Sequence, residues 1–300
     1  MAFAHSPLRY PGGKQVLTRV LAQLVKLNGV QGGTYAEAYA GGGGAALGLL
    51  FGEHVERVLI NDADPRILAF WTAVLNHTER FLELLRTTRL SVREWVHQRA
   101  IYQQPRRYST LRVGFATFYL NRCNRSGIIA SGGPIGGKKQ TGAWKIDARF
   151  NREELARRIE KIDAYRDRIF VSGLDAIDFL EQHVKPLAGR ERVFTYLDPP
   201  YFAKGRDLYL NHYKADDHAA LAAWLSSKAT FPWALSYDNV REIRKLYAAF
   251  RQLSFGLDYS ARERRVEREI MILKPDLIVP PSWKRRIPQR VVSAADRLAS

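Results

Sequence analysis

The 300-residue chain carries 47 Lys and Arg residues against 30 Asp and Glu residues, which gives a formal net charge of +17 at pH 7. A surplus of this size indicates a polyanionic partner, with nucleic acid as the first candidate. An anionic membrane surface is the second candidate, although no basic amphipathic helix stands out. The single cysteine excludes an internal disulfide and a cysteine-based metal cage, and it suits a reducing cytosol. The longest apolar stretch, residues 45–51, is too short to span a bilayer, so we expect a cytoplasmic protein without a membrane segment.

A proline–glycine–glycine turn at residues 11–13 stands near the start of the chain. The apolar residues after it recur at helical spacing from Val16 to Leu24, so a helix is predicted to begin near Lys14. Two glycines before a helix leave backbone N–H groups free for an anionic ligand and allow it to approach closely. A plain turn is the simpler interpretation, but Tyr10 and Lys14 can contact a ligand ring or carboxylate, which favours a binding role.

A second glycine-rich turn, residues 41–44, lies between a predicted strand that ends at Glu37 and an apolar predicted helix. Gly41, Gly43 and Ala46 approximate the dinucleotide-binding pattern, so a nicotinamide-dependent oxidoreductase remains an alternative. An anion at Glu37 would repel a pyrophosphate, which favours a cofactor that has no phosphates and carries an amino group. We therefore predict that Glu37, Gly41 and Gly43 bind such a cofactor.

The second predicted strand, residues 58–62, ends in a carboxylate at Asp62. Asp62 lies about 20 residues beyond the glycines, the spacing at which an acid reaches ribose hydroxyls. A helix N-cap is an alternative role, but Asp64 suits that role better because Pro65 follows it at the first helical position. Asp62 is therefore predicted to bind a ribose.

Residues 66–122 show the spacing of several helices, and the composition then becomes polar, basic and glycine-rich up to residue 142. This segment predicts a mobile hairpin or loop pair whose cations follow a phosphate backbone and whose tip enters a groove. A solvated loop without a partner is the alternative. Ile128, Ile129 and Trp144 are expected to anchor the segment. Its predicted DNA contacts are Arg122, Arg125, Lys138 and Lys139.

Asp175 follows a third predicted strand, residues 169–172, and so lies at the same edge of the sheet as the other strand-end acids. Its carboxylate is able to accept a hydrogen bond from an adenine amino group, which makes it a predicted cofactor contact. Equally, it suits the N-cap of a helix over residues 176–181, and both interpretations stay open.

The most informative stretch is the apolar run Val193–Leu197, which leads directly into Asp198, Pro199, Pro200 and Tyr201. The run predicts a buried strand, and the two prolines end it because they cannot donate to a sheet ladder. They also stiffen the chain just beyond the carboxyl end of the strand, where open α/β sheets bind their ligands. A strand followed by a rigid turn is the simplest interpretation of this stretch taken alone.

Three basic segments follow this stretch. A loop over residues 202–213 carries Arg206 among tyrosines and is expected to close over a base or a backbone. A charged turn over residues 261–268 carries Arg264, and the tail over residues 281–300 is basic and expected to be loosely held. Arg206 and Arg264 join the predicted DNA contacts.

Four of these motifs occur in the order found in the Dam-type DNA adenine methylases, which the chain resembles over roughly residues 6–275. The motifs are Tyr10-Pro-Gly-Gly-Lys14, Glu37 with Gly41-x-Gly43, Asn61-Asp62-x-Asp64, and Asp198-Pro-Pro-Tyr201. Residues 120–122 and the glycine-rich segment after them resemble that family's DNA-recognition insert. The chain departs from the family pattern around residues 39–40 and at residues 124–126, so the family's target sequence is not carried over.

The resemblance implies S-adenosylmethionine as the cofactor and an adenine in double-stranded DNA as the substrate. Tyr10, Lys14, Asp62 and Asp198 match positions that contact the cofactor in that family. A cognate restriction endonuclease as a second partner and the oligomeric state are left open by the resemblance.

The expected fold is α/β, a Rossmann-like methyltransferase sheet with helices on both faces. A mostly helical target-recognition domain with a hairpin is inserted into it. We expect the catalytic domain at residues 1–75 and 165–280, the insert at residues 76–164, and a basic tail at residues 281–300.

The chemistry expected of Asp198 follows from the exocyclic amine of adenine, a poor nucleophile because its lone pair is delocalised into the ring. Two acceptors aimed at its N–H bonds would favour a pyramidal nitrogen, and the Asp198 carboxylate and the Pro199 carbonyl can supply them. Pro200 stiffens the turn, and Tyr201 is expected to stack on a base flipped out of the duplex. Cytosine N4, RNA and a glutamine side chain are alternative acceptors, and an inactive nucleic-acid-binding module is a further alternative.

Overall fold

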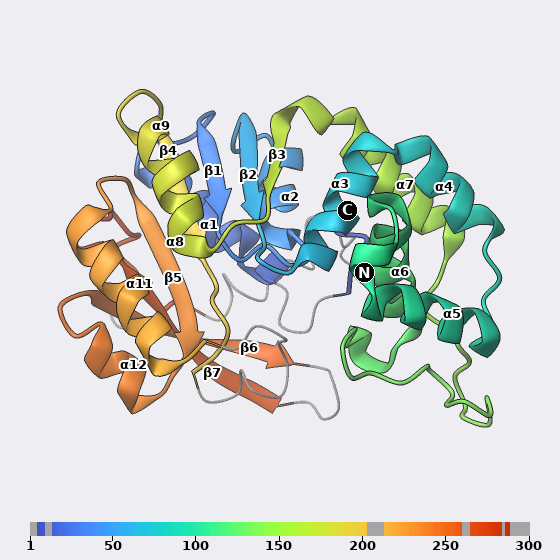
Figure 1. The fold of residues 1–300 in the computed structure, drawn as a ribbon. Coiled ribbons are helices and arrows are strands. Elements are labelled where there is room, and N and C mark those ends of the chain that lie inside the picture. The colour runs from blue at the N-terminus through green and yellow to red at the C-terminus, as the bar shows by residue number, and fades with distance from the viewer. Residues whose placement is uncertain (1–4, 10–13, 203–212, 260–264, 284–285, 289–300) are drawn as a thin grey trace.

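The computed structural model describes residues 5–9, 14–202, 213–259, 265–283 and 286–288. The predicted contacts Tyr10, Arg206 and Arg264 lie outside these residues, as does most of the basic tail. A seven-stranded sheet runs through the molecule, with helices on both faces and a further group of helices beside it (Figure 1). The predicted α/β class is confirmed.

The sheet is mixed, and its strands are β1 (Thr34–Glu37), β2 (Arg57–Asn61), β3 (Ile169–Ser172), β4 (Val193–Leu197), β5 (Trp233–Asp238), β6 (Arg251–Tyr259) and β7 (Arg265–Leu273). Their order across the sheet is β3-β2-β1-β4-β5-β7-β6. The first five strands are parallel, and β7 lies antiparallel between β5 and β6. The chain leaves β1 toward β2 and β3 and then returns to β4, so the order reverses between β1 and β4. In an open α/β sheet, the crevice beyond the carboxyl ends of such a pair of strands binds the ligand.

Helices occur at the predicted positions, and two more, over residues 185–188 and 241–246, were not predicted. They are α1 (Thr18–Leu27), α2 (Gly44–Phe51), α3 (Pro65–Asn76), α4 (Thr78–Thr87), α5 (Val92–Gln103), α6 (Thr110–Cys123), α7 (Arg152–Ala164), α8 (Ala176–Phe179), α9 (Lys185–Ala188), α11 (Ala215–Lys228) and α12 (Arg241–Leu246). A 3-10 turn, Lys14–Leu17, leads into α1, so the helix predicted near Lys14 is confirmed. A π-helical turn, Leu180–Val184, links α8 to α9. Within the described ranges, none of these helices combines the length and the apolarity that a membrane crossing requires.

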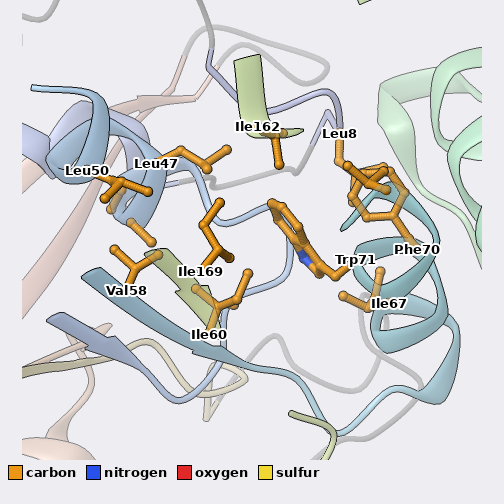
Figure 2. Packing of buried hydrophobic residues seen from close by; sticks show 14 of the residues in the cluster. Leu8, Leu47, Leu50, Val58, Ile60, Ile67, Phe70, Trp71, Ile162 and Ile169 are labelled. Atoms are coloured by element: carbon orange, nitrogen blue, oxygen red, sulfur yellow. The ribbon is translucent and has the colours of Figure 1, made fainter. Parts of the chain in front are cut away.

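The parallel strands β1, β2, β4 and β5 are buried on both faces, to which successive side chains of a strand point in turn, whereas the edge strand β3 leaves Phe170 exposed. Tyr35 of β1 packs into a first core with α1, α2 and α3, whereas its neighbour Ala36 packs into a second core with α8 and α11. Figure 2 shows part of the first core, where side chains from β2, α2 and α3 gather in one cluster. The two cores fix the sheet between its helical layers and so set the position of the strand ends.

The helices α4 to α7 lie between α3 and β3 in the chain and form the group beside the sheet (Figure 1). α6 approaches α3 closely because Gly114 has no side chain: a Cβ there would lie 2.4 Å from the carbonyl oxygen of Ala69. Phe70 of α3 and Phe118 of α6 stack with their ring centroids 6.3 Å apart, so the inserted helices share the first core. The predicted hairpin after α6 is a series of turns, with an antiparallel bridge between Asn124 and Pro134.

Candidate active site

Asp198 follows β4 at the point where the strand order reverses. Its carboxylate oxygen Oδ1 accepts a hydrogen bond of 2.6 Å from Ser236 Oγ on β5 and lies 3.3 Å from Lys14 Nζ. Tyr196 Oη lies 2.7 Å from the same Ser236 hydroxyl. Both contacts of Asp198 fall on Oδ1, so the other oxygen, Oδ2, can face a substrate. Burial raises the pKa of Asp198 to about 6; the Lys14 ammonium opposes the rise, and the Glu269 carboxylate adds to it.

Lys14 lies at the centre of a buried charged cluster, with 5% of its surface exposed. Its Nζ donates to Tyr201 Oη at 2.9 Å and lies 3.2 Å from Glu269 Oε2, in addition to the contact with Asp198. Tyr201 Oη in turn donates to Glu269 Oε1. The cluster therefore places one ammonium between two carboxylates and fixes the hydroxyl of Tyr201. Contacts of Lys14 with a cofactor and of Tyr201 with a base stay predictions, while the partners seen for both are side chains of the protein.

Two members of this site, Glu269 and Ser236, are missed by reasoning from the sequence. Glu269 directly precedes four apolar residues, 270–273, and looks there like the end of the charged turn. An acid beside an apolar strand is seldom buried without a partner, so its position next to this run is the signal that would have singled it out. For Ser236, a small residue inside a buried strand, the sequence carries no comparable signal.

The second glycine-rich turn is tight because Gly41 and Gly43 adopt left-handed backbone conformations, with φ values of 48° and 59°. A Cβ on Gly43 would lie 2.8 Å from Cζ2 of Trp71, whose Nε1 donates to the Gly41 carbonyl at 3.0 Å. The backbone N–H groups of Gly41 and Asp64 donate to the two oxygens of Asp62, each at 2.9 Å. Asp62 therefore braces the turn, and burial raises its pKa to about 6. Asp64 is the N-cap of α3, as predicted, while the ribose contact of Asp62 stays a prediction.

Glu37 ends β1 beside this turn, and its side chain is buried. The backbone N–H of Ala46, in the first turn of α2, hydrogen-bonds to its carboxylate. Its Oε2 atom has no hydrogen-bond partner among the residues that the structure describes. Burial raises the pKa of Glu37 to about 8, and the Asp198 carboxylate adds to the rise. Such an acid suits a cationic ligand, because an opposite charge beside it would favour its ionised form.

Asp175 is exposed and accepts a hydrogen bond of 2.9 Å from the backbone N–H of Ile177. Its role as the N-cap of α8 is therefore observed, and α8 continues into the π-helical turn, so that all of the predicted residues 176–181 are helical. Its contact with a cofactor stays a prediction.

Asn61 holds the strand ends at this edge of the sheet together. Its Nδ2 donates to the carbonyls of Ala38 and Leu174, each at 3.0 Å, and its Oδ1 accepts from the Leu174 N–H at 2.9 Å. The end of β1, the end of β2 and the segment after β3 are thereby fixed to one another beside the glycine-rich turn.

Comparison with known proteins identifies the family of the chain. The family model described as D12 class N6 adenine-specific DNA methyltransferase matches residues 10–260. The chain belongs to this family. The prediction of an adenine-specific DNA methyltransferase, made from the Dam-type resemblance, is thereby confirmed. No curated protein matches the chain in sequence. Among solved structures, the rRNA methyltransferase aviRa from Streptomyces viridochromogenes is 16% identical over 91% of this chain and 89% of that chain, with a TM-score of 0.38.

In this D12-class enzyme, the predicted DNA contacts of the insert fall into two groups. Arg125, Lys138 and Lys139 are exposed, so their side chains can reach a phosphate backbone. Arg122 is 7% exposed, and its Nε donates to the carbonyl of Pro7 at 2.6 Å. Burial lowers the pKa of Arg122 to about 9. Arg122 therefore bonds to the protein's own backbone, and its DNA contact stays a prediction.

The insert of the methyltransferase is anchored by a polar network and not by Trp144, which is 71% exposed. Asn121 is buried; its Oδ1 accepts from the backbone N–H of Arg9 at 2.6 Å, and its Nδ2 donates to the carbonyls of Arg9 and Gly127. Ile129 packs against the first core, as predicted. The expectation for Trp144 was wrong because aromatic content alone does not show which side of a loop faces the protein.

Proposed function

We propose that this enzyme transfers the methyl group of S-adenosylmethionine to the N6 amine of an adenine flipped out of double-stranded DNA. The observation that carries the proposal is the Asp198 carboxylate, held through one oxygen by Lys14 and Ser236 at the point where the strand order reverses. The chain that carries Asp198 has a net charge of +17, which favours binding to the phosphates of DNA.

The residues around the crevice fit a cationic cofactor. Glu37, Asp198 and Glu269 bring three carboxylates near the ammonium of Lys14, and the Glu37 Oε2 atom lacks a partner within the described part of the chain. S-adenosylmethionine, when bound, supplies an electrophilic methyl group on a positively charged sulfonium. The residues that we propose to hold it are Tyr10, Lys14, Glu37, Gly41, Gly43, Asp62, Asp175 and Asp198.

Asp198 and Pro199 are the proposed acceptors for the two N–H bonds of the adenine amine. Lys14 and Ser236 hold Oδ1 of Asp198, so the carboxylate is oriented before the substrate arrives and needs no rearrangement during the reaction. With a pKa of about 6, Asp198 is mostly ionised at neutral pH and can also take up the proton that the amine loses. Pro200 stiffens the turn that presents both acceptors.

The target atom cannot be reached inside a stacked duplex, so the adenine must leave the stack. The Tyr201 ring is proposed to stack on the flipped base, while its hydroxyl stays bonded to Lys14 and Glu269. The helical insert, residues 76–164, is proposed as the target-recognition domain on the catalytic domain of residues 1–75 and 165–280. Its exposed cations Arg125, Lys138 and Lys139 are proposed to contact phosphates, together with Arg206 and Arg264.

The test is transfer of tritiated methyl from S-adenosylmethionine to double-stranded DNA, followed by separation of the nucleosides. We expect label in N6-methyladenine. Label in N4-methylcytosine, or in the adenine of an RNA substrate, would replace the proposed acceptor with one of the alternatives for the same fold. Absence of label from every nucleic acid tested would refute the proposed function.

A further inference from the structure

Glu269 is a buried acid that the strand order brings to the active site. β7 runs antiparallel to β5, so the middle of β7 meets the carboxyl end of β5, with Glu269 opposite Asp238. Its side chain is 1% exposed and lies against Lys14 and Tyr201, from which it is separated by 255 and 68 residues of sequence. A buried charge is costly unless it is paired, and an apolar side chain would suit a strand core better. Its presence in this strand therefore calls for a role in the cluster.

One cation, the ammonium group of Lys14, contacts two acids, Asp198 and Glu269. The Lys14 ammonium nitrogen lies 2.9 Å from Tyr201 Oη, 3.2 Å from Glu269 Oε2 and 3.3 Å from Asp198 Oδ1. The two carboxylates therefore share the positive charge of Lys14. Glu269 also accepts a hydrogen bond from the Tyr201 hydroxyl, so it fixes the direction of that hydroxyl.

We propose that Glu269 is a positioning residue of the methyl transfer, which shares Lys14 with Asp198 and thereby keeps Asp198 a stronger hydrogen-bond acceptor for the substrate amine. The proposal rests on the proposed function, in which Asp198 accepts from that amine. Without the charge of Glu269, Lys14 would interact more strongly with Asp198 and would weaken Oδ2 of Asp198 as an acceptor.

The surroundings of Asp198 support this role. The described charged, titratable and hydrogen-bonding groups around its carboxylate come from five elements: Lys14 before α1, Tyr35 and Glu37 on β1, Tyr196 on β4, Ser236 on β5 and Glu269 on β7. Lys14 and Ser236 lower the pKa of Asp198, whereas Glu269 raises it, so removal of the Glu269 charge is expected to lower it.

The test compares Glu269→Gln with the wild type in two measurements. Glutamine retains the shape and an oxygen acceptor but removes the charge. The titration of Asp198, followed through its ¹³C carboxyl signal, is expected to move to lower pH by about one unit. The acid limb of the kcat profile against pH is expected to move in the same direction. The plateau is expected to fall by roughly tenfold, since a less basic carboxylate is a weaker acceptor.

Two further variants separate charge from structure. Glu269→Asp keeps the charge, so its acid limb is expected at the wild-type position even where the rate falls. Should the glutamine variant fail to fold, an acid limb of the aspartate variant away from the wild-type position would overturn the proposal. Glu191→Gln removes an exposed acid that is paired with Arg57 at the amino ends of the parallel strands, away from the active site. This variant is expected to change neither measurement.

An unmoved Asp198 titration in Glu269→Gln, or a moved titration with an unmoved acid limb, would overturn the proposal. An aspartate variant whose acid limb moves as far as that of the glutamine variant would overturn it as well. A wild type that labels no nucleic acid refutes the proposed function instead, and the ¹³C titration, which needs no turnover, then still decides whether Glu269 controls Asp198.

Discussion

Glu37→Gln offers a direct test of how the cofactor site works, because this acid is buried and its Oε2 atom lacks a partner in the described structure. With a pKa of about 8, raised first by burial and then by Asp198, the free enzyme keeps Glu37 mostly protonated at pH 7. A cationic group beside Oε2 would favour the carboxylate. Cofactor binding is therefore expected to release the proton of Glu37.

The size of the effect follows from the pKa. A group whose pKa lies one unit above the pH costs about 1.4 kcal/mol to ionise, which is a factor of about ten in affinity. The free enzyme holds the proton below pH 8 and the complex releases it, so affinity is expected to rise with pH. The rise should be about tenfold per unit between roughly pH 6 and 8, and it should level off above pH 8. Glutamine at this position should remove the part of the dependence that comes from Glu37.

The assay is isothermal titration calorimetry with S-adenosylmethionine at pH 6, 7, 8 and 9, in two buffers with different ionisation enthalpies. The α-amino group of the cofactor titrates near pH 8 itself. The Glu37→Gln variant shows the contribution of this group together with those of Asp62 and Asp198, and the difference between the two proteins isolates Glu37. Equal pH slopes and equal proton release in the wild type and the variant would refute the reasoning.

The remaining predictions concern catalysis, DNA contact and the glycine-rich turn. Asp198→Ala should abolish methyl transfer and leave DNA affinity nearly unchanged in a filter-binding assay; a loss of DNA binding as large as the loss of transfer would make the residue structural. Replacing Lys138 and Lys139 together by alanine should reduce the slope of log K against log salt by about two; an unchanged slope excludes both from the interface. Gly43→Ala should lower the free energy of unfolding by about 1–3 kcal/mol in urea, because its Cβ would meet an indole at 2.8 Å in a left-handed conformation. Gly29→Ala, which has the same sign of φ but no atom within 4 Å, should cost less, and an equal cost would leave the indole contact without effect.

The sequence by itself determined the elements that local chemistry defines. The apolar runs before Asp62 and Asp198 become β2 and β4. Short runs of consecutive apolar residues that are closed by a polar residue or by prolines are typical of buried strands. Asp64 with the proline after it caps α3 wherever that helix packs. The glycines at 41 and 43 are similarly local, since they supply the left-handed conformations that the turn requires.

Only the tertiary structure decided which side chains meet. Glu269 reaches Lys14 because β7 is antiparallel and lies next to β5, and a sequence pattern does not give strand order or direction. Arg122 and Trp144 also show that a sequence pattern does not decide burial. Arg122 is buried and donates to the carbonyl of Pro7 in the N-terminal segment, whereas the side chain of Trp144 is exposed to solvent. The periodicity of apolar residues indicates which residues can be buried. The partner of a buried charge comes from a distant part of the chain. The position of that partner is fixed only when the sheet and the helical layers pack together.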